Sequence, residues 1–175
     1  DVRKILALIP QEPFVFAGTI RRNLDPFEEF SEAAAQHALD RVGLSSFKLQ
    51  GLVQENGEGL SVGERQLVSL ARLLLQPAAR CILLDEPSSS LDTASDDAIQ
   101  ALLSTESRQR GCSCLCIAHR LGTILDYDMI LVLDRGKVLE IGCPSDMLAV
   151  SDSPLSKLLN GQYAPDISKE SLCSI

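Results

Sequence analysis

The sequence of 175 residues contains no tryptophan, and only 4% of its residues are aromatic. It has no apolar run near the ~20 residues that a membrane-spanning helix needs, and its N-terminus is not typical of a secretory signal. Basic residues are few, with 16 lysines and arginines against 24 aspartates and glutamates. The net charge of -8 argues against a surface that binds nucleic-acid phosphates or anionic lipid, so we expect no nucleic-acid partner.

The usual cysteine patterns of zinc and redox sites are also missing. Six cysteines are present, but there is no C-x-x-C pair and no histidine at the spacing that zinc sites use. Most of the cysteines fall within apolar runs, where cysteine behaves as a small buried hydrophobic residue. Cys112, Cys114 and Cys116 alternate, so they would share one face of a strand. A soft-metal or redox site on that face is the alternative to simple burial.

The 45% of apolar residues suffices for the buried core of one domain. An apolar run over residues 4–9 predicts a strand, which is followed by Pro10-Gln11-Glu12-Pro13. The two prolines force an extended link. Gln11 is therefore expected on a loop at the end of this strand.

Helical patterns dominate the next part of the chain. Residues 31–43 begin with a serine cap, continue through alanines and end at a glycine, which predicts a short helix. Residues 61–76 carry leucines at helical spacing and stop before Pro77, which predicts a longer helix. We expect residues 19–76 to be chiefly helical.

The pattern then changes to that of a parallel sheet. A short apolar run over residues 81–84 is typical of a buried parallel strand. A predicted helix over 93–108 connects it to a second apolar run over 112–118. Strand, helix and strand in this order predict a right-handed crossover.

The last third of the chain is expected to be simpler. Residues 129–133 and 137–141 flank Asp134-Arg135-Gly136 and predict a hairpin. A terminal helix is expected from Pro144 onward. We expect the polar residues 164–175 to be a frayed tail.

Two acidic residues, Asp85 and Glu86, follow the first parallel strand directly. The carboxyl ends of such strands are where open α/β sheets place ligand chemistry. Adjacent strand residues point to opposite faces, so the pair can act together only if the chain bends. One carboxylate could then hold Mg²⁺ while the other orients water on a phosphate. The alternative is an ordinary strand that ends in acidic residues.

Ser61 and Glu64 have the S-x-x-E spacing of a capping box at the start of the longer helix. The hydroxyl of Ser61 and the open backbone at Gly63 would also lie at the positive end of the helix dipole, which suits a phosphate. A helix cap alone is the competing interpretation.

His119 ends the 112–118 strand and is expected at the same sheet edge as the two acids. A histidine there could hydrogen-bond a terminal phosphate. A purely structural histidine is the alternative.

Five segments in this order resemble the motifs of an ATP-binding-cassette (ABC) nucleotide-binding domain: Pro10-Gln11, LSVGERQ from Leu60, ILLDEP from Ile82, Ser90-Leu91-Asp92 and Ala118-His119-Arg120. The resemblance extends from residue 5 to about residue 160. It implies ATP and Mg²⁺ as ligands. It also implies that Gln11 is the Q-loop glutamine, which coordinates Mg²⁺ and senses the transmembrane domain.

The resemblance assigns roles to the other motifs. Asp85 corresponds to the Walker B aspartate, a metal ligand, Glu86 to the catalytic glutamate and His119 to the catalytic switch histidine. The segment from Ser89 to Asp92 corresponds to the D-loop, which crosses the interface between two cassettes. The signature motif, which reaches the γ-phosphate of ATP held by a partner cassette, comprises Ser61, Val62, Gly63 and Glu64.

The segment GTIRRNLDPF, residues 18–27, resembles the second nucleotide-binding domain of subfamily C exporters, the multidrug-resistance-associated type. The glutamate at position 86 and the valine at position 62 agree with that resemblance. Val62 replaces the usual first glycine of the signature, and its β-branched side chain restricts backbone approach to a phosphate. The composite site that uses this signature is therefore expected to be the weaker hydrolase.

No G-x-x-x-x-G-K-[ST] phosphate loop occurs in the sequence. The expected fold is thus an α/β, P-loop NTPase-like parallel sheet core that lacks its phosphate-loop strand, with an inserted α-helical subdomain. We expect a partial cassette over 1–163, with a helical subdomain over 19–76, a RecA-like core over 1–18 and 77–163, and the tail over 164–175. The chain alone is expected neither to bind ATP tightly nor to hydrolyse it.

The leading hypothesis is the ATPase domain of a membrane exporter of organic anions or drugs, at the cytoplasmic face of the membrane. Its partners would be a second nucleotide-binding domain, in a head-to-tail ATP sandwich, and the transmembrane domains of the same transporter. One alternative is a soluble ABC ATPase. Another is a truncated, non-hydrolysing cassette that acts as a regulatory subunit.

Overall fold

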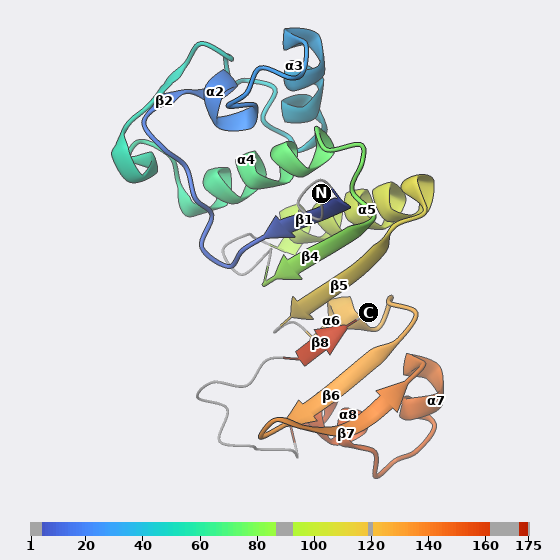
Figure 1. Ribbon diagram of the computed structural model, residues 1–175. Coiled ribbons are helices and arrows are strands. Elements are labelled where there is room, and N and C mark those ends of the chain that lie inside the picture. The colour runs from blue at the N-terminus through green and yellow to red at the C-terminus, as the bar shows by residue number, and fades with distance from the viewer. Residues whose placement is uncertain (1–4, 87–92, 119–120, 162–171, 175) are drawn as a thin grey trace.

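The computed structural model describes residues 5–86, 93–118, 121–161 and 172–174 (Figure 1). A six-stranded sheet runs through it in the order β1-β4-β5-β8-β6-β7. Its strands are β1 (Leu6–Ile9), β4 (Cys81–Asp85), β5 (Ser113–Ala118), β6 (Ile130–Asp134), β7 (Lys137–Gly142) and β8 (Leu172–Ser174).

The first three strands of the sheet are parallel. β1 pairs with β4, and β4 pairs with β5. Helix α5 (Thr93–Arg110) connects β4 to β5, which confirms the predicted strand, helix and strand order. Because these strands run in one direction, their carboxyl ends meet at the same edge of the sheet.

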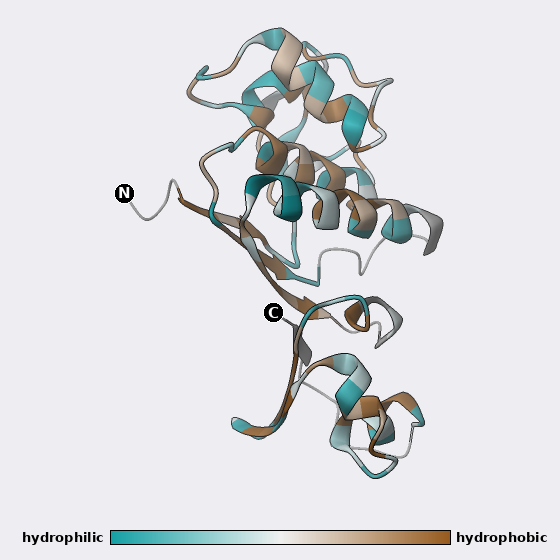
Figure 2. Ribbon diagram, turned by 90° about the vertical axis from the view of Figure 1, so that its right-hand side faces the viewer, coloured by the Kyte–Doolittle hydropathy of each residue, from teal (hydrophilic) through white to brown (hydrophobic). Residues whose placement is uncertain are grey.

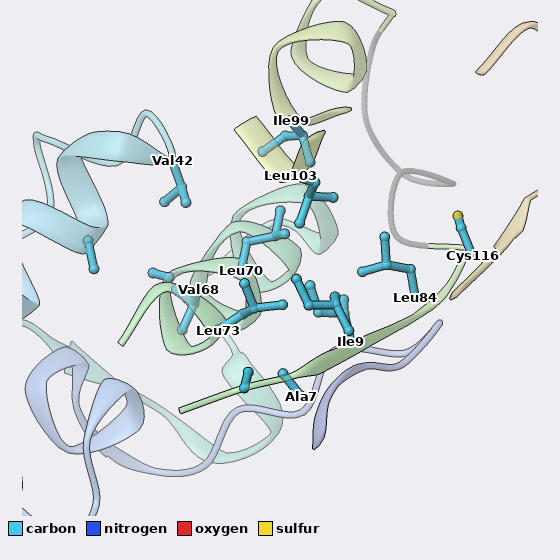
Figure 3. Close-up of a cluster of buried hydrophobic side chains, with 14 of the residues drawn as sticks. Ala7, Ile9, Val42, Val68, Leu70, Leu73, Leu84, Ile99, Leu103 and Cys116 are labelled. Carbon is cyan, nitrogen blue, oxygen red and sulfur yellow. The ribbon is translucent and has the colours of Figure 1, made fainter. Parts of the chain in front are cut away.

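The core lies between this parallel part of the sheet and two helices. Figure 3 shows Ile9 and Leu84 from the strands facing Leu70 of α4 (Val62–Leu74) and Leu103 of α5. All four side chains are almost fully buried. Figure 2 shows mostly hydrophobic residues along the central strands and hydrophilic residues on much of α5. The burial of apolar side chains on this face is what holds the strand ends in place.

Residues 18–74 form a largely helical segment on one side of the sheet (Figure 1). The segment also contains a 3₁₀ turn, Glu55–Gly57, and a two-stranded antiparallel sheet that the sequence did not predict. The expected helical content is therefore confirmed, while the subdomain boundaries stay a prediction. The segment's main elements are α2 (Ile20–Leu24), α3 (Glu32–Arg41), α4, β2 (Gly18–Thr19) and β3 (Leu52–Val53).

The predicted hairpin is confirmed as the antiparallel pair of β6 and β7. The single terminal helix expected from Pro144 is wrong, because two short helices, α7 (Pro144–Leu148) and α8 (Pro154–Leu159), occupy this region. The hydroxyl of Ser153 caps α8 by accepting a hydrogen bond from the Ser156 amide. A serine cap followed by proline starts a new helix rather than continuing the old one.

The prediction of a frayed tail over 164–175 is wrong near its end, where residues 172–174 form strand β8. Strand β8 lies between β5 and β6 and pairs antiparallel with both. Backbone groups on two facing strand edges need hydrogen-bond partners, and β8 supplies some of them. A three-residue strand has too little sequence to reveal itself by periodicity.

Candidate functional site

The two acidic residues lie where β4 ends. Asp85 is the last residue of the strand and is half-buried, while Glu86 follows it and is only 8% exposed. Glu86 has a φ of 48°, a left-handed conformation that is uncommon for a residue other than glycine. Its backbone amide donates to the carbonyl of Ile117 at 2.9 Å, which holds the bend against β5. The chain thus bends at Glu86, which is the condition that the sequence set for the two acids to act together.

Gln11 joins Glu86 at this sheet edge. The side-chain amide of Gln11 donates to Oε2 of Glu86 at 3.0 Å, although 75 residues separate the two in sequence. The contact follows from the parallel register, which pairs Ile9 of β1 with Leu84 of β4. The sequence indicated each residue on its own, but it carried no signal for a direct bond between them.

The oxygen atoms at this edge are of the type that Mg²⁺ binds. Asp85 contributes a carboxylate, and Gln11, whose nitrogen bonds Glu86, retains its Oε1 as an acceptor. Among the described residues there is no cluster of three or more His, Cys, Asp and Glu able to hold a metal. Mg²⁺ is commonly held by one or two carboxylates together with substrate phosphates and water, and the carboxylate of Asp85 with Oε1 of Gln11 fits that donor set.

The predicted capping box at the start of α4 is confirmed. The Ser61 hydroxyl accepts from the Glu64 amide at 3.2 Å, and the Glu64 carboxylate accepts from the Ser61 amide at 2.7 Å. Both bonds serve the helix itself. Val62 is 43% exposed and Gly63 is half-buried, so the first turn of α4 faces solvent in part. Capping does not exclude a phosphate at this helix start, but no bond shown there points to one.

Other predicted site residues lie outside the described residues. These are Ser89, Asp92 and His119.

The cysteines of β5 are buried thiols. Cys116 is buried and Cys114 is half-buried, and neither forms a disulfide bond. Burial, with the neighbouring Cys116 adding to it, raises the pKa of Cys114 to about 12. A thiol that stays protonated is a poor metal ligand and a poor nucleophile. Simple burial therefore explains Cys114 better than a soft-metal or redox site.

Two residues that the sequence did not single out hold the Gln11 loop in place. Arg72, near the end of α4, bonds the carbonyl of Phe14 and both oxygens of Asn23. Arg72 is a single charged residue within an apolar run over residues 70–75, but nothing in the sequence connects it with Asn23.

Two acidic residues at the end of one parallel strand, with a glutamine after the neighbouring strand, lie at the carboxyl edge of the sheet, where α/β proteins generally bind their ligands. The family model described as "ABC transporter" matches residues 1–89. The chain belongs to the ABC transporter family.

Relatives within that family agree with this assignment. The chain is 43% identical over 167 residues to ABC transporter C family member 7 of Arabidopsis thaliana. It is 42% identical over 165 residues to multidrug resistance protein mrp-7 of Caenorhabditis elegans. Each match covers 91% of this chain and 11% of the relative, so the chain spans about a tenth of the length of these proteins.

The fold has a counterpart among solved structures. A bacterial Atm1-family ABC exporter with ATP bound superposes with a TM-score of 0.81 at 32% identity, over 94% of this chain and 30% of that one. The predicted ABC ATPase type of α/β fold is thereby confirmed. No helix in the described part of this chain is both long enough and apolar enough to cross a membrane.

Proposed function

We propose that this chain is part of the ATP-hydrolysing cassette of a membrane exporter. The observation that carries the proposal is the bond between Gln11 and Glu86 at the edge where Asp85 ends β4. This places the glutamine, the carboxylate and the strand end predicted for metal and water chemistry within one small region. The family membership and the ATP-bound exporter of similar fold support the same function.

Each residue at this edge has a proposed role. Glu86 orients and polarises the water that attacks the γ-phosphate, since its buried carboxylate is held by a bent backbone. Asp85 and the Oε1 of Gln11 would hold Mg²⁺, which neutralises charge on the phosphates when bound. Because Gln11 bonds Glu86 through its nitrogen and would bind the metal through Oε1, it would link the metal to the hydrolytic carboxylate and sense whether nucleotide is present. His119 would contact the γ-phosphate.

The start of α4 is proposed to act on a different ATP molecule. Ser61 and Gly63 would face the γ-phosphate of ATP held by a second cassette, in a head-to-tail pair that Ser89 and Asp92 help to join. The partly exposed first turn and the positive end of the helix dipole support this role. Val62 stands where glycine would allow closer approach, so this composite site is the slower one.

We assign the parent protein to the exporters of subfamily C and the chain to its second cassette. The C-family relatives and the segment at residues 18–27 support this assignment. Substrates would be organic anions or drugs, and the cassette would lie at the cytoplasmic face of the membrane. Phe14, close to Gln11 and well exposed, supports contact with the transmembrane domains.

By itself the chain is expected to be inactive, because it has no phosphate loop to supply amide donors and a lysine to the triphosphate. Calorimetry of this chain with MgATP should detect no binding in the micromolar range. Micromolar binding would contradict this expectation.

The coding sequence upstream of residue 1 tests the whole proposal. A phosphate loop and transmembrane segments are expected there, and the protein that includes the loop should bind MgATP. An upstream sequence without a phosphate loop would overturn the proposal.

A further inference from the structure

The loop that carries Gln11 is tied to helix α4 by one arginine. Arg72 donates from Nη1 to the carbonyl of Phe14 at 2.5 Å and from Nε to the carbonyl of Asn23 at 2.6 Å. Its Nη2 also reaches the side-chain oxygen of Asn23 at 3.1 Å. Three bonds from one planar guanidinium fix both distance and orientation, which a flexible ammonium does not do.

Asn23 passes this restraint to the residues after Gln11. Its side-chain nitrogen donates to the carbonyls of Phe16 at 2.9 Å and Thr19 at 3.1 Å, and its side-chain oxygen accepts from the Phe16 amide at 3.0 Å. Asn23 itself is 1% exposed. A buried amide with all of its bonds satisfied holds one conformation of the segment that it closes.

Gln11 therefore lies between two fixed points. On one side Ile9 is held in β1 by its pairing with Leu84. On the other side Phe14 is held by Arg72, and Pro13 between them restricts the backbone further. Only residues 10–13 lie between these two fixed points, so the backbone has few conformations in which to bring the Gln11 amide to Glu86.

We infer that Arg72 is a positioning residue that sets Gln11 against Glu86 and couples this contact to helix α4, which begins at Ser61. A shift of the Gln11 loop then moves α4, and a shift of α4 moves the loop. The inference rests on the proposed function only for the effect on Mg²⁺ binding, where Gln11 acts as a metal ligand. The positioning of Gln11 against Glu86 is a contact within this chain and does not depend on that function.

Burial lowers the pKa of Arg72, yet its three acceptors favour the charged form of the guanidinium. Arg72→Lys keeps the charge and loses the fork of donors, so it tests geometry rather than charge. Arg41→Lys is the matched control, because Arg41 uses its guanidinium on Glu106 of α5, away from the Gln11 loop.

The first measurement is NMR of the side-chain amide of Gln11, with Glu86→Ala defining the signal of the free amide. In Arg72→Lys the Gln11 signal should move most of the way toward the free position. The backbone amide of Phe16, which donates to the side-chain oxygen of Asn23, should exchange its hydrogen with solvent roughly tenfold faster or more. The reason is that Asn23 loses its bonds from the charged guanidinium of Arg72. Arg41→Lys should leave both signals in place even if its melting temperature falls equally.

An unchanged Gln11 signal in folded Arg72→Lys would overturn the inference, and so would an equal change in Arg41→Lys. If Arg72→Lys does not fold, Asn23→Asp replaces it, because this change keeps the acceptor oxygen and removes the donors to Phe16 and Thr19. It should shift the Gln11 signal in the same direction, and no shift would count against the inference.

The second measurement uses the protein that includes its phosphate loop. Arg72→Lys should raise the KM for Mg²⁺ severalfold more than it lowers kcat, while Arg41→Lys should alter neither. Equal effects of the two variants would contradict a positioning role. Absence of ATPase activity in the unmodified protein would instead refute the proposed function and leave the NMR result to stand by itself.

Discussion

Glu106 of α5 offers a sharp test of how the helical segment over residues 18–74 is attached to α5. Its carboxylate is 5% exposed and bonds Arg41 of α3 at 2.7 Å and Arg110 of its own helix at 2.5 Å. Arg110 also donates to the carbonyls of Leu73 and Leu74 at the end of α4. Glu106 and Arg110 together thus link α3, α4 and α5, and Glu106→Gln removes the carboxylate charge with little change in shape.

The size of the effect follows from burial. Removing one partner of a buried ion pair costs about 3–5 kcal/mol. Arg41 is 29% exposed and Arg110 is 15% exposed, so water can solvate part of the charge left behind. An amide also keeps one acceptor oxygen. We therefore expect Glu106→Gln to lower the free energy of unfolding by about 2 kcal/mol at neutral pH.

The pH dependence separates this ion triad from ordinary packing. Burial would raise the pKa of Glu106, but the bond from Arg41 and the charge of Arg110 outweigh it and lower the pKa below the ordinary 4.5. The pKa of Glu106 is lower in the folded state than in the unfolded state. The stabilisation that the charged carboxylate gives the fold is therefore complete above about pH 4.5, and it is lost as the pH falls through the pKa of the folded state. The wild type and Glu106→Gln should therefore converge in acid.

Urea unfolding at a series of pH values provides the assay. Glu58→Gln is the control, because Glu58 is an exposed carboxylate, and this change should cost less than about 0.5 kcal/mol. A difference between wild type and Glu106→Gln that stays constant into acid would refute the electrostatic explanation. So would a loss at neutral pH no larger than that of Glu58→Gln.

Two further predictions concern local packing. Iodoacetamide should label the exposed Cys143 first. Cys114, whose pKa is raised to about 12 by burial, should react only on unfolding. Mass spectrometry of the labelled peptides measures the order, and early labelling of Cys114 would contradict this prediction. Gly57→Ala should lower stability by about 1–3 kcal/mol, because the added Cβ would lie 2.3 Å from a methyl carbon of Val15 at a φ of +73°. Gly59→Ala, at a φ of +92° with open space around it, should cost less, and equal melting temperatures for the two variants would contradict the steric explanation.

Local patterns predicted much of the fold. The capping box of Ser61 and Glu64 marked the start of α4, and the apolar run before Asp85 marked β4, because both signals lie within a few residues. The order of strand, helix and strand then predicted that β4 and β5 are parallel. The hairpin of β6 and β7 was predicted by its turn residues.

Contacts between distant residues could not be predicted in this way. Gln11 and Glu86 are 75 residues apart, and Arg72 and Asn23 are 49 residues apart. Their meeting depends on strand register and helix packing, which no local period encodes. The insertion of β8 between β5 and β6 likewise depends on which strand edges remain open after the rest of the sheet has formed.

The central claim is that Glu86 carries the hydrolytic step of an ABC cassette. Its most direct test is steady-state ATPase activity and MgATP affinity in the protein that includes the phosphate loop, compared between wild type and Glu86→Gln. We expect the variant to bind MgATP with similar affinity and to lose turnover by roughly 10²-fold or more. A Glu86→Gln variant that hydrolyses ATP at the wild-type rate would contradict it.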